Sequence, residues 1–272
     1  MIYLIYREVI IVNNVNKTLY IPLYGKALVS KKGIINIDKK AEKIWEKEQF
    51  PLKKKSKSKY LAYYMSMRSW VFDEWTKNKI SEYPNAIILH LGCGLDSRIL
   101  RLDNSTVKWF DIDFESVINE RKRYYTETEA YHMISGNIAE NTFISSLPNA
   151  ERAIVILEGV SMYLSNDELK TTLSKLKDKY SNLSILLDCY SPFAAKMSKI
   201  KNPINDVGVS DVYGIEASSV LENGTGLSFV KEHNLTPNNL ITQLKSFEKF
   251  IFKSLYAGKM SKKLYKLYEY QG

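Results

Sequence analysis

The stretch from Ala86 to Arg98, AIILHLGCGLDSR, decides how the chain folds. Residues 86–91 are apolar apart from His90, and they lead directly into the sequence GCG at residues 92–94. A short apolar run that stops at glycine is typical of a buried strand of a parallel sheet followed by a tight turn. We therefore predict a strand over residues 86–91 and a helix that begins near Leu95.

The glycine turn is a place where a ligand can bind, although such turns also occur without one. Gly92 and Gly94 let the backbone approach a ligand closely, and the helix after them points its free N–H groups beyond the strand. Ser97 stands where a dinucleotide fingerprint has its third glycine, which argues against NAD or FAD. A nucleoside cofactor without phosphate, such as S-adenosylmethionine, needs only close approach and an acid for its ribose.

After the turn, the chain alternates predicted strands and helices, which is typical of a doubly wound, mostly parallel α/β sheet. Ser165 and Glu168 form a capping box at the start of the best-defined helix. With the strand at 86–91, the predicted strands make a sheet of seven: the others are 107–112, 131–134, 153–157, 183–187, 227–232 and 247–255.

The N-terminal part has a helical pattern instead. Apolar residues recur at helical spacing over residues 38–49 and 60–77, whereas residues 17–30 are predicted to form an ordered loop that leads into a short helix. We expect residues 1–83 to form a helical cap and residues 84–272 the core of the same domain.

Arg68 lies inside the apolar stripe of the helix predicted at 60–77. Its side chain could pack its stem and extend its guanidinium to water, or it could bind a carboxylate. The sequence favours the first interpretation slightly and leaves the second open.

Acidic residues follow three of the predicted strands: Asp111 and Asp113 the second, Glu158 the fourth and Asp188 the fifth. Ligands of open α/β sheets bind at the carboxyl ends of the strands, so these acids and the glycine turn should face one crevice. The spacing of two places Asp111 and Asp113 on one face of their strand, so that turn geometry decides which of them reaches a ribose. We expect Asp113.

Composition and charge set wider limits. The chain has 272 residues, of which 45% are apolar, and this is enough for a sizeable core. Its net charge of +9 could attract nucleic acid or acidic substrates, but much of the excess lies in lysine runs at 53–59 and 259–266, which are more often solvated surface.

The two cysteines and residues 1–12 bear on where the protein is located in the cell. Cys93 and Cys189 form neither a disulfide framework nor a zinc motif, and a reducing cytoplasm is the simplest location. Residues 1–12 are apolar but interrupted by charge, too short to cross a bilayer and without an export signal, so we expect no membrane. They could form a strand, or they could include a few dispensable residues that an upstream start codon adds.

Several blocks together resemble a known family. LGCGLDSR at 91–98, WFDIDF at 109–114 and LEGVSMYL at 157–164 are similar to signature blocks of the leucine carboxyl methyltransferase and tetracenomycin polyketide synthesis O-methyltransferase-like family. YIPLYGKALVS at 20–30, MRSW at 67–70 and YSPF at 190–193 resemble further blocks of its polyketide-type branch.

This resemblance implies a Rossmann-like class I methyltransferase that uses S-adenosylmethionine, with N-terminal helices over the cofactor. The residues that it implies for cofactor binding are Gly92 and Gly94 in the turn, Asp113 at the ribose, Glu158 near the methionine part, and Arg68 and Lys26 at the carboxylate. Asn137 and Ile138 stand where the family has Asp-Leu. The amide oxygen of asparagine can still accept a hydrogen bond from the adenine amine.

The acceptor and the catalytic residues stay open. A hydroxyl or carboxylate of a small molecule, or a protein carboxyl, would suit the family, and only a hydroxyl benefits from a general base. Tyr163, Tyr190, His132 and His233 are candidates for that base, although packing or surface roles are more common for such residues. A nucleic-acid-binding protein or RNA methyltransferase is the main alternative, but EGVSMY stands where base methyltransferases carry an N/D-P-P-Y/F block.

Overall fold

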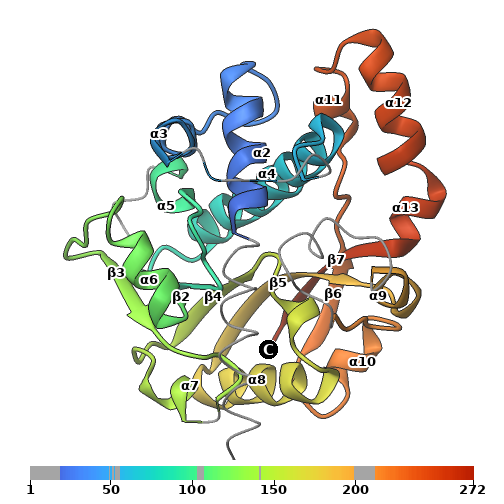
Figure 1. Cartoon of the computed structure of the whole chain (residues 1–272). Coiled ribbons are helices and arrows are strands. Elements are labelled where there is room, and N and C mark those ends of the chain that lie inside the picture. The colour runs from blue at the N-terminus through green and yellow to red at the C-terminus, as the bar shows by residue number, and fades with distance from the viewer. Residues whose placement is uncertain are drawn as a thin grey trace, which may run out of the picture.

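A seven-stranded sheet runs through the centre of the molecule (Figure 1). The structure is a computed structural model that describes residues 19–48, 50, 52, 56–102, 107–140, 142–198 and 212–272. The strands are β1 (Ile87–Leu91), β2 (Trp109–Asp113), β3 (Tyr131–Ser135), β4 (Arg152–Leu157), β5 (Asn182–Tyr190), β6 (Ser228–Glu232) and β7 (Tyr265–Gln271). Their order is β3-β2-β1-β4-β5-β7-β6, and β7 is antiparallel to both of its neighbours while the other pairs are parallel. The predicted mostly parallel, seven-stranded sheet is confirmed.

Helices cover both faces of this sheet. Side chains alternate along β1, so that Ile87 and Leu89 pack with the leucines of α8 (Asn166–Lys179) while Ile88 packs with α4 (Lys59–Glu82) on the other face. The capping box of Ser165 and Glu168 is present at the start of α8. The helices are α2 (Tyr20–Lys31), α3 (Lys39–Glu48), α4 (Lys59–Glu82), α5 (Arg98–Arg101), α6 (Glu115–Arg121), α7 (Phe143–Ser146), the 3-10 helix η1 (Ser161–Tyr163), α8 (Asn166–Lys179), α9 (Pro192–Ser198), α10 (Ser219–Glu222), α11 (Asn238–Ile241), α12 (Ser246–Tyr256) and α13 (Lys259–Leu264).

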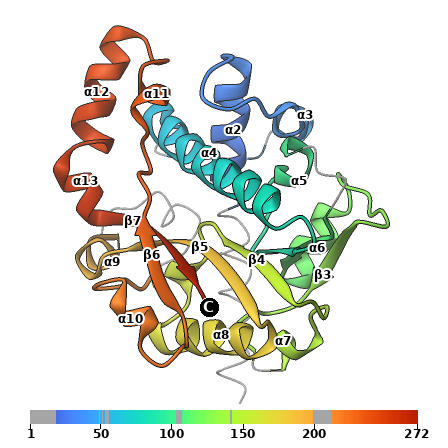
Figure 2. The same ribbon diagram turned by 180° about the vertical axis from the view of Figure 1, so that it is seen from behind.

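The N-terminal and C-terminal helices share a hydrophobic cluster. Val29 of α2 and Met67 of α4 pack with Leu240 of α11 and Phe252 of α12, although about 200 residues separate the two groups in sequence. Figure 2 shows α11 and α12 at the same end of the molecule as α2 and α4. The helices that cover the cavity described below therefore come from both ends of the chain.

The C-terminal elements differ from the prediction. Residues 247–255, predicted as a strand, lie in α12, because Glu248, Phe252 and Tyr256 are spaced by four and face the rest of the protein as one side of a helix. The last strand is β7, whose first two residues belong to the lysine run at 259–266 that is predicted to be solvated surface. A run of aromatic residues has high strand propensity, and here tertiary packing overrides it.

Smaller differences concern helix starts. The helix after the glycine turn begins at Arg98 and has only four residues, so Leu95 lies in the turn. Residues 20–31 form a regular helix instead of a loop and a short helix, and Pro22 is tolerated in its first turn. Residues 1–12 and 53–55, with their apolar and lysine runs, lie outside the described residues. No helix in the described part of the chain is long and apolar enough to cross a membrane.

Candidate active site

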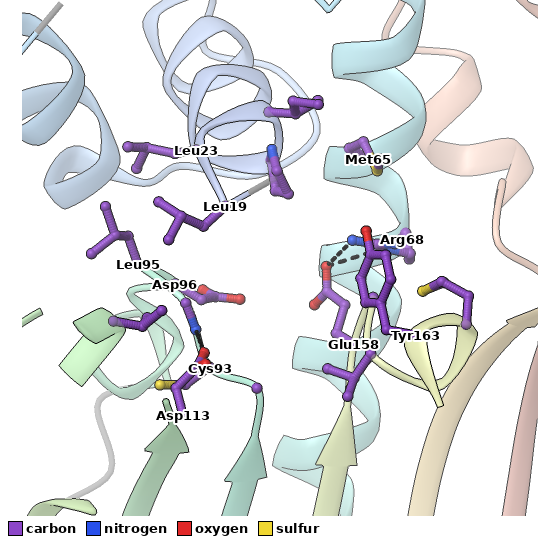
Figure 3. Close-up of a pocket in the computed structure, with 18 of the residues that line it drawn as sticks. Leu19, Leu23, Met65, Arg68, Cys93, Leu95, Asp96, Asp113, Glu158 and Tyr163 are labelled. Carbon is purple, nitrogen blue, oxygen red and sulfur yellow. Dashed lines mark hydrogen bonds and ion pairs between the residues drawn. The ribbon is translucent and has the colours of Figure 1, made fainter. Parts of the chain in front are cut away.

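A cavity of about 340 Å³ lies where the carboxyl ends of β1, β2 and β4 face helices α2 and α4. Figure 3 shows Leu19 and Leu23 on the α2 side of this cavity, with Asp113 and Cys93 at the strand ends below them. Its size suits a small ligand. All eight residues predicted to bind the cofactor line it: Lys26, Arg68, Gly92, Gly94, Asp113, Asn137, Ile138 and Glu158.

The glycine turn after β1 requires glycine at its first position. Gly92 and Gly94 have φ angles of +68° and +52°, which disfavour residues with a Cβ atom. A Cβ atom on Gly92 would also lie 2.3 Å from Cγ2 of Val160, closer than any packed atom can be. The bare backbone of the turn therefore lines the cavity, and Nη1 of Arg121 supports it by donating to the Gly94 carbonyl oxygen at 2.9 Å.

Asp113 presents its carboxylate to the cavity. The N–H of Gly94 donates to Oδ2 and the N–H of Phe114 donates to Oδ1, both at 2.8 Å. Burial raises the pKa of Asp113 to about 6, against the opposing effect of these two N–H groups. The carboxylate is therefore mainly ionised at neutral pH, and each oxygen keeps a lone pair for a ligand.

Asp111, in contrast, is bonded to side chains of the protein and does not face the cavity. It is fully buried and accepts hydrogen bonds from Nε1 of Trp109 at 2.9 Å and from the hydroxyl of Tyr131 at 2.7 Å, and it pairs with Arg121. Nδ1 of His90 lies 3.1 Å from its Oδ1. Burial alone would raise the pKa of Asp111, but Arg121 and His90 hold it at about 2. Asp111 does not line the cavity and instead holds Arg121, which supports the glycine turn.

Arg68 is buried, with only 3% of its surface exposed, so the interpretation that its head reaches water is wrong. Its Nε donates to Oε1 of Glu158 at 3.1 Å, and its Nη1 donates to Oδ2 of Asp188 at 2.9 Å and to the Tyr265 hydroxyl at 2.7 Å. Figure 3 shows Arg68 and Glu158 side by side across the cavity from Asp113. Arg68 thus reaches the cavity already paired with two acids.

Lys26 is the second cation of the cavity wall, and it too is paired. Its Nζ lies 2.6 Å from Oδ2 of Asp96, a cavity residue that sequence reasoning did not single out. Asp96 belongs to the quoted GCGLDSR block, so position within that block was the available signal. Arg98, also in that block, pairs with Glu158.

The other end of the cavity is rich in tyrosine. Tyr163 and Tyr190, proposed from sequence, line it together with three tyrosines that were missed. The missed residues are Tyr64 of α4, Tyr256 of α12 and Tyr265 of β7. Tyr64 lies 5.3 Å from Tyr256 and 6.1 Å from Tyr265 between ring centroids, and Tyr190 lies 5.0 Å from Tyr265. Tyr256 ends α12, whose residues 247–255 were predicted as a strand, and Tyr265 begins β7, which was not predicted.

The two histidines considered as bases lie away from the cavity. His132 stacks on Phe110 at 5.1 Å between ring centroids, and Nε2 of His233 pairs with Glu269 at 2.6 Å. Neither lines the cavity. Both side chains thus have their contacts outside the cavity.

Comparison with known proteins assigns the family. The profile of leucine carboxyl methyltransferases matches residues 13–177. The tetracenomycin polyketide synthesis O-methyltransferase TcmP of Streptomyces glaucescens is 28% identical over 189 residues, which are 69% of this chain and 70% of that protein. The S-adenosyl-L-methionine-dependent methyltransferase dpfgK of Gibberella zeae is 26% identical over 140 residues, 48% of this chain and 47% of that protein.

The fold agrees with this assignment. Magnesium protoporphyrin IX methyltransferase from Synechocystis, solved with bound SAH, superposes with a TM-score of 0.51 at 10% identity, covering 91% of this chain and 99% of that one. None of these findings supports the nucleic-acid alternative. Because the matched profile spans more than half of the sequence, the protein belongs to the leucine carboxyl methyltransferase family of S-adenosylmethionine-dependent methyltransferases.

Proposed function

We propose that the protein transfers a methyl group from S-adenosylmethionine to an oxygen atom of a small molecule with an aromatic or apolar body. The observation that carries this proposal is the division of the cavity into a polar end at β1 and β2 and a tyrosine-lined end at α4, α12 and β7. The similarity to TcmP, an O-methyltransferase of polyketide synthesis, supports it.

The polar end fits the nucleoside of the cofactor. Each carboxylate oxygen of Asp113 accepts one backbone N–H and keeps capacity for a ribose hydroxyl. Gly92 has no side chain that would block the approach of the ligand to the backbone. The amide oxygen of Asn137, which accepts the Ala139 N–H at 3.1 Å, would accept a second hydrogen bond from the adenine amine beside Ile138.

The paired charges in the middle of the cavity fit the amino-acid part. Arg68 and Lys26 would hold its carboxylate, and Glu158 would lie near its ammonium group. The guanidinium of Arg68 would then be shared between the ligand and the two acids that it already contacts. Arginine suits this task because its planar fork bonds a carboxylate through two donors.

The chain's own contribution to the reaction is positioning. When bound, S-adenosylmethionine supplies a methyl group that its sulfonium already activates. Holding an acceptor oxygen in line with that group can contribute as much as ~7–11 kcal/mol. The tyrosines would hold an acceptor ring by stacked and edge contacts worth ~0.5–1.5 kcal/mol each beyond the area they bury.

A transfer assay tests this proposal. The purified protein would be incubated with methyl-labelled S-adenosylmethionine and acceptors of matched size: phenols, aromatic carboxylic acids and aliphatic alcohols. We expect label on the oxygen of aromatic acceptors, as an ether or as an ester that mild base removes. Transfer to nitrogen, or equal transfer to aliphatic alcohols, would contradict the proposal.

Replacing Tyr64 and Tyr256 by leucine separates acceptor binding from cofactor binding. These changes should raise KM for the acceptor and leave the affinity for S-adenosylmethionine unchanged, because both side chains lie at the tyrosine-lined end. Loss of cofactor affinity in the tyrosine variants would place the cofactor, not the acceptor, at that end.

A further inference from the structure

Helix α12 carries an apolar side that faces solvent. Phe247 and Phe250 are 74% and 73% exposed, and with Ile251 they lie on one side of the helix at spacings of three and four. Figures 1 and 2 both show α12 at the outer margin of the molecule, beyond α4. Large side chains are rarely exposed together in this way without a binding role.

The opposite side of α12 already holds the helix in place. Phe252 is fully buried against α4, and the Glu248 carboxylate accepts hydrogen bonds from Nζ of Lys59 and from the Tyr63 hydroxyl, both at 2.8 Å. The exposed phenylalanines therefore play no part in docking α12 onto the protein.

The chain around this apolar side is rich in lysine. Between residues 245 and 263 the chain has six lysines and a single acid, Glu248, which Lys59 and Tyr63 occupy. Within the described residues none of the six has an ion pair. They are Lys245, Lys249, Lys253, Lys259, Lys262 and Lys263. Leu255 and Met260, exposed by 60% and 74%, extend the apolar side toward α13. We name these six lysines together with Phe247, Phe250, Ile251, Leu255 and Met260 the Phe-Lys ridge.

We propose that the Phe-Lys ridge binds the surface of a bilayer that contains anionic phospholipids. Exposed aromatic and aliphatic side chains can enter the boundary between headgroups and acyl chains, while flanking lysines pair with anionic headgroups. Each lysine near such a surface contributes roughly as much as a fivefold gain in affinity. The expectation of no membrane concerned spanning segments, and a surface contact by a short helix is a different kind of association.

Charge argues against a second copy of the chain as the occupant. A two-fold interface places the same patch on both subunits, so the six lysines would meet the same six lysines with no free acid between them. A bilayer can also accept the two protruding phenylalanine side chains without a groove of matching shape. The ridge shares α12 with Tyr256 of the cavity wall, so membrane contact would bring the cavity close to the lipid surface.

Vesicle flotation of the whole chain tests the proposal. We expect the protein to float with vesicles of phosphatidylcholine and phosphatidylserine, to stay in solution with phosphatidylcholine alone, and to be released by high salt. Equal flotation with both vesicles, or flotation with neither, would overturn the proposal.

Matched variants locate the contact. Phe247→Ser with Phe250→Ser should weaken binding to the anionic vesicles at least about tenfold, given the apolar area they expose. Ile37→Ser with Leu100→Ser removes two other exposed apolar side chains, near α3 and in α5, and should bind like the wild type. Thermal unfolding would establish that both pairs fold. Undiminished binding of the phenylalanine pair, or a dimer in solution that this pair dissociates, would contradict a lipid contact at the ridge.

A second pair of variants tests the role of charge. Lys249→Glu with Lys253→Glu should weaken binding at least about tenfold. Lys108→Glu with Lys122→Glu changes the net charge equally at exposed positions in the β2 and α6 region and should have a much smaller effect. Equal losses for the two pairs would mean that overall charge, not the ridge, attracts the protein to the vesicles.

Discussion

Asp111 and Asp113 both lie in β2, two residues apart, and their carboxylates have different environments. The charge of Asp111 is matched by Arg121 in a fully buried site, whereas Asp113 is held only by backbone N–H groups at the edge of the cavity. The first residue therefore supports the structure of the turn, and the second is available to a ligand.

Replacing each acid by alanine should produce two different defects. Asp113→Ala should cost ~1.5–3 kcal/mol of S-adenosylmethionine binding, because a charged acceptor is lost. Asp111→Ala should instead lower the free energy of unfolding by ~3–5 kcal/mol, because Arg121 stays buried without its partner. Calorimetric titration and urea unfolding measure the two effects. Equal losses of affinity in both variants, each measured while folded, would overturn the assignment of the ribose to Asp113.

The pKa of Asp113 predicts how cofactor binding depends on pH. Burial raises the pKa of Asp113 in the folded protein to about 6. Between the ordinary pKa of an aspartate and pH 6, the folded state without ligand binds more protons than the unfolded state. The free energy of unfolding therefore falls as the pH rises through this range. A ligand that needs the ionised carboxylate competes with the proton. We expect the affinity for S-adenosylmethionine to be level above pH 6 and to fall as the pH decreases through about 6, by at most about tenfold per pH unit. Calorimetry would follow this dependence, and Asp113→Asn should lack it.

Arg68→Lys tests whether the buried guanidinium also binds the cofactor carboxylate. Lysine cannot copy the bidentate fork, so the variant should bind S-adenosylmethionine at least about tenfold more weakly. 5′-Methylthioadenosine keeps the nucleoside but lacks the carboxylate, and its affinity should be nearly unchanged. A parallel loss for both ligands would mean that Arg68 only holds Glu158 and Asp188 in place.

At the scale of elements, the turn between β1 and α5 tolerates a methyl group unequally at its two glycines. At Gly94 an added Cβ atom would meet Leu19 at an ordinary 3.5 Å, so Gly94→Ala should cost only the ~1–2 kcal/mol of a left-handed backbone. Gly92→Ala should cost a further ~1–3 kcal/mol, because Val160 must move. Urea unfolding of the two variants measures the difference, and equal costs would mean that the turn adjusts freely.

Strand prediction succeeded for β1 to β6 and failed at the last strand, β7. The runs at β1, β4 and β5 are mainly apolar and bounded by turn residues, and such runs are read correctly because both faces of the centre of a parallel sheet are buried. In α12 the aromatic residues suggested a strand, whereas β7 contains charged and tyrosine residues that are buried between β5 and β6. Local propensity does not report such neighbours.

At the scale of the whole molecule, ligand binding should stabilise the fold. S-adenosylmethionine at about a hundredfold excess over Kd should add ~2.7 kcal/mol to the free energy of unfolding, because it binds only the folded state. NAD at the same concentration should add nothing, since the turn lacks the third glycine of a dinucleotide site. Thermal unfolding with each ligand compares them. Stabilisation by NAD and not by S-adenosylmethionine would contradict the assigned cofactor.

The sequence by itself determined the sheet class, the glycine turn, the capping box of α8 and the meeting of that turn with Asp113 and Glu158 at one edge of the sheet. These features depend on neighbours within a few residues and on the rule that parallel strands present their carboxyl ends together. Only the tertiary structure decided that Asp111 is paired with Arg121, that Arg68 is buried between Glu158 and Asp188, and that tyrosines from α4, α12 and β7 meet in the cavity. Partners of this kind lie up to about 200 residues apart in the chain, and their contact follows from packing that no local pattern records.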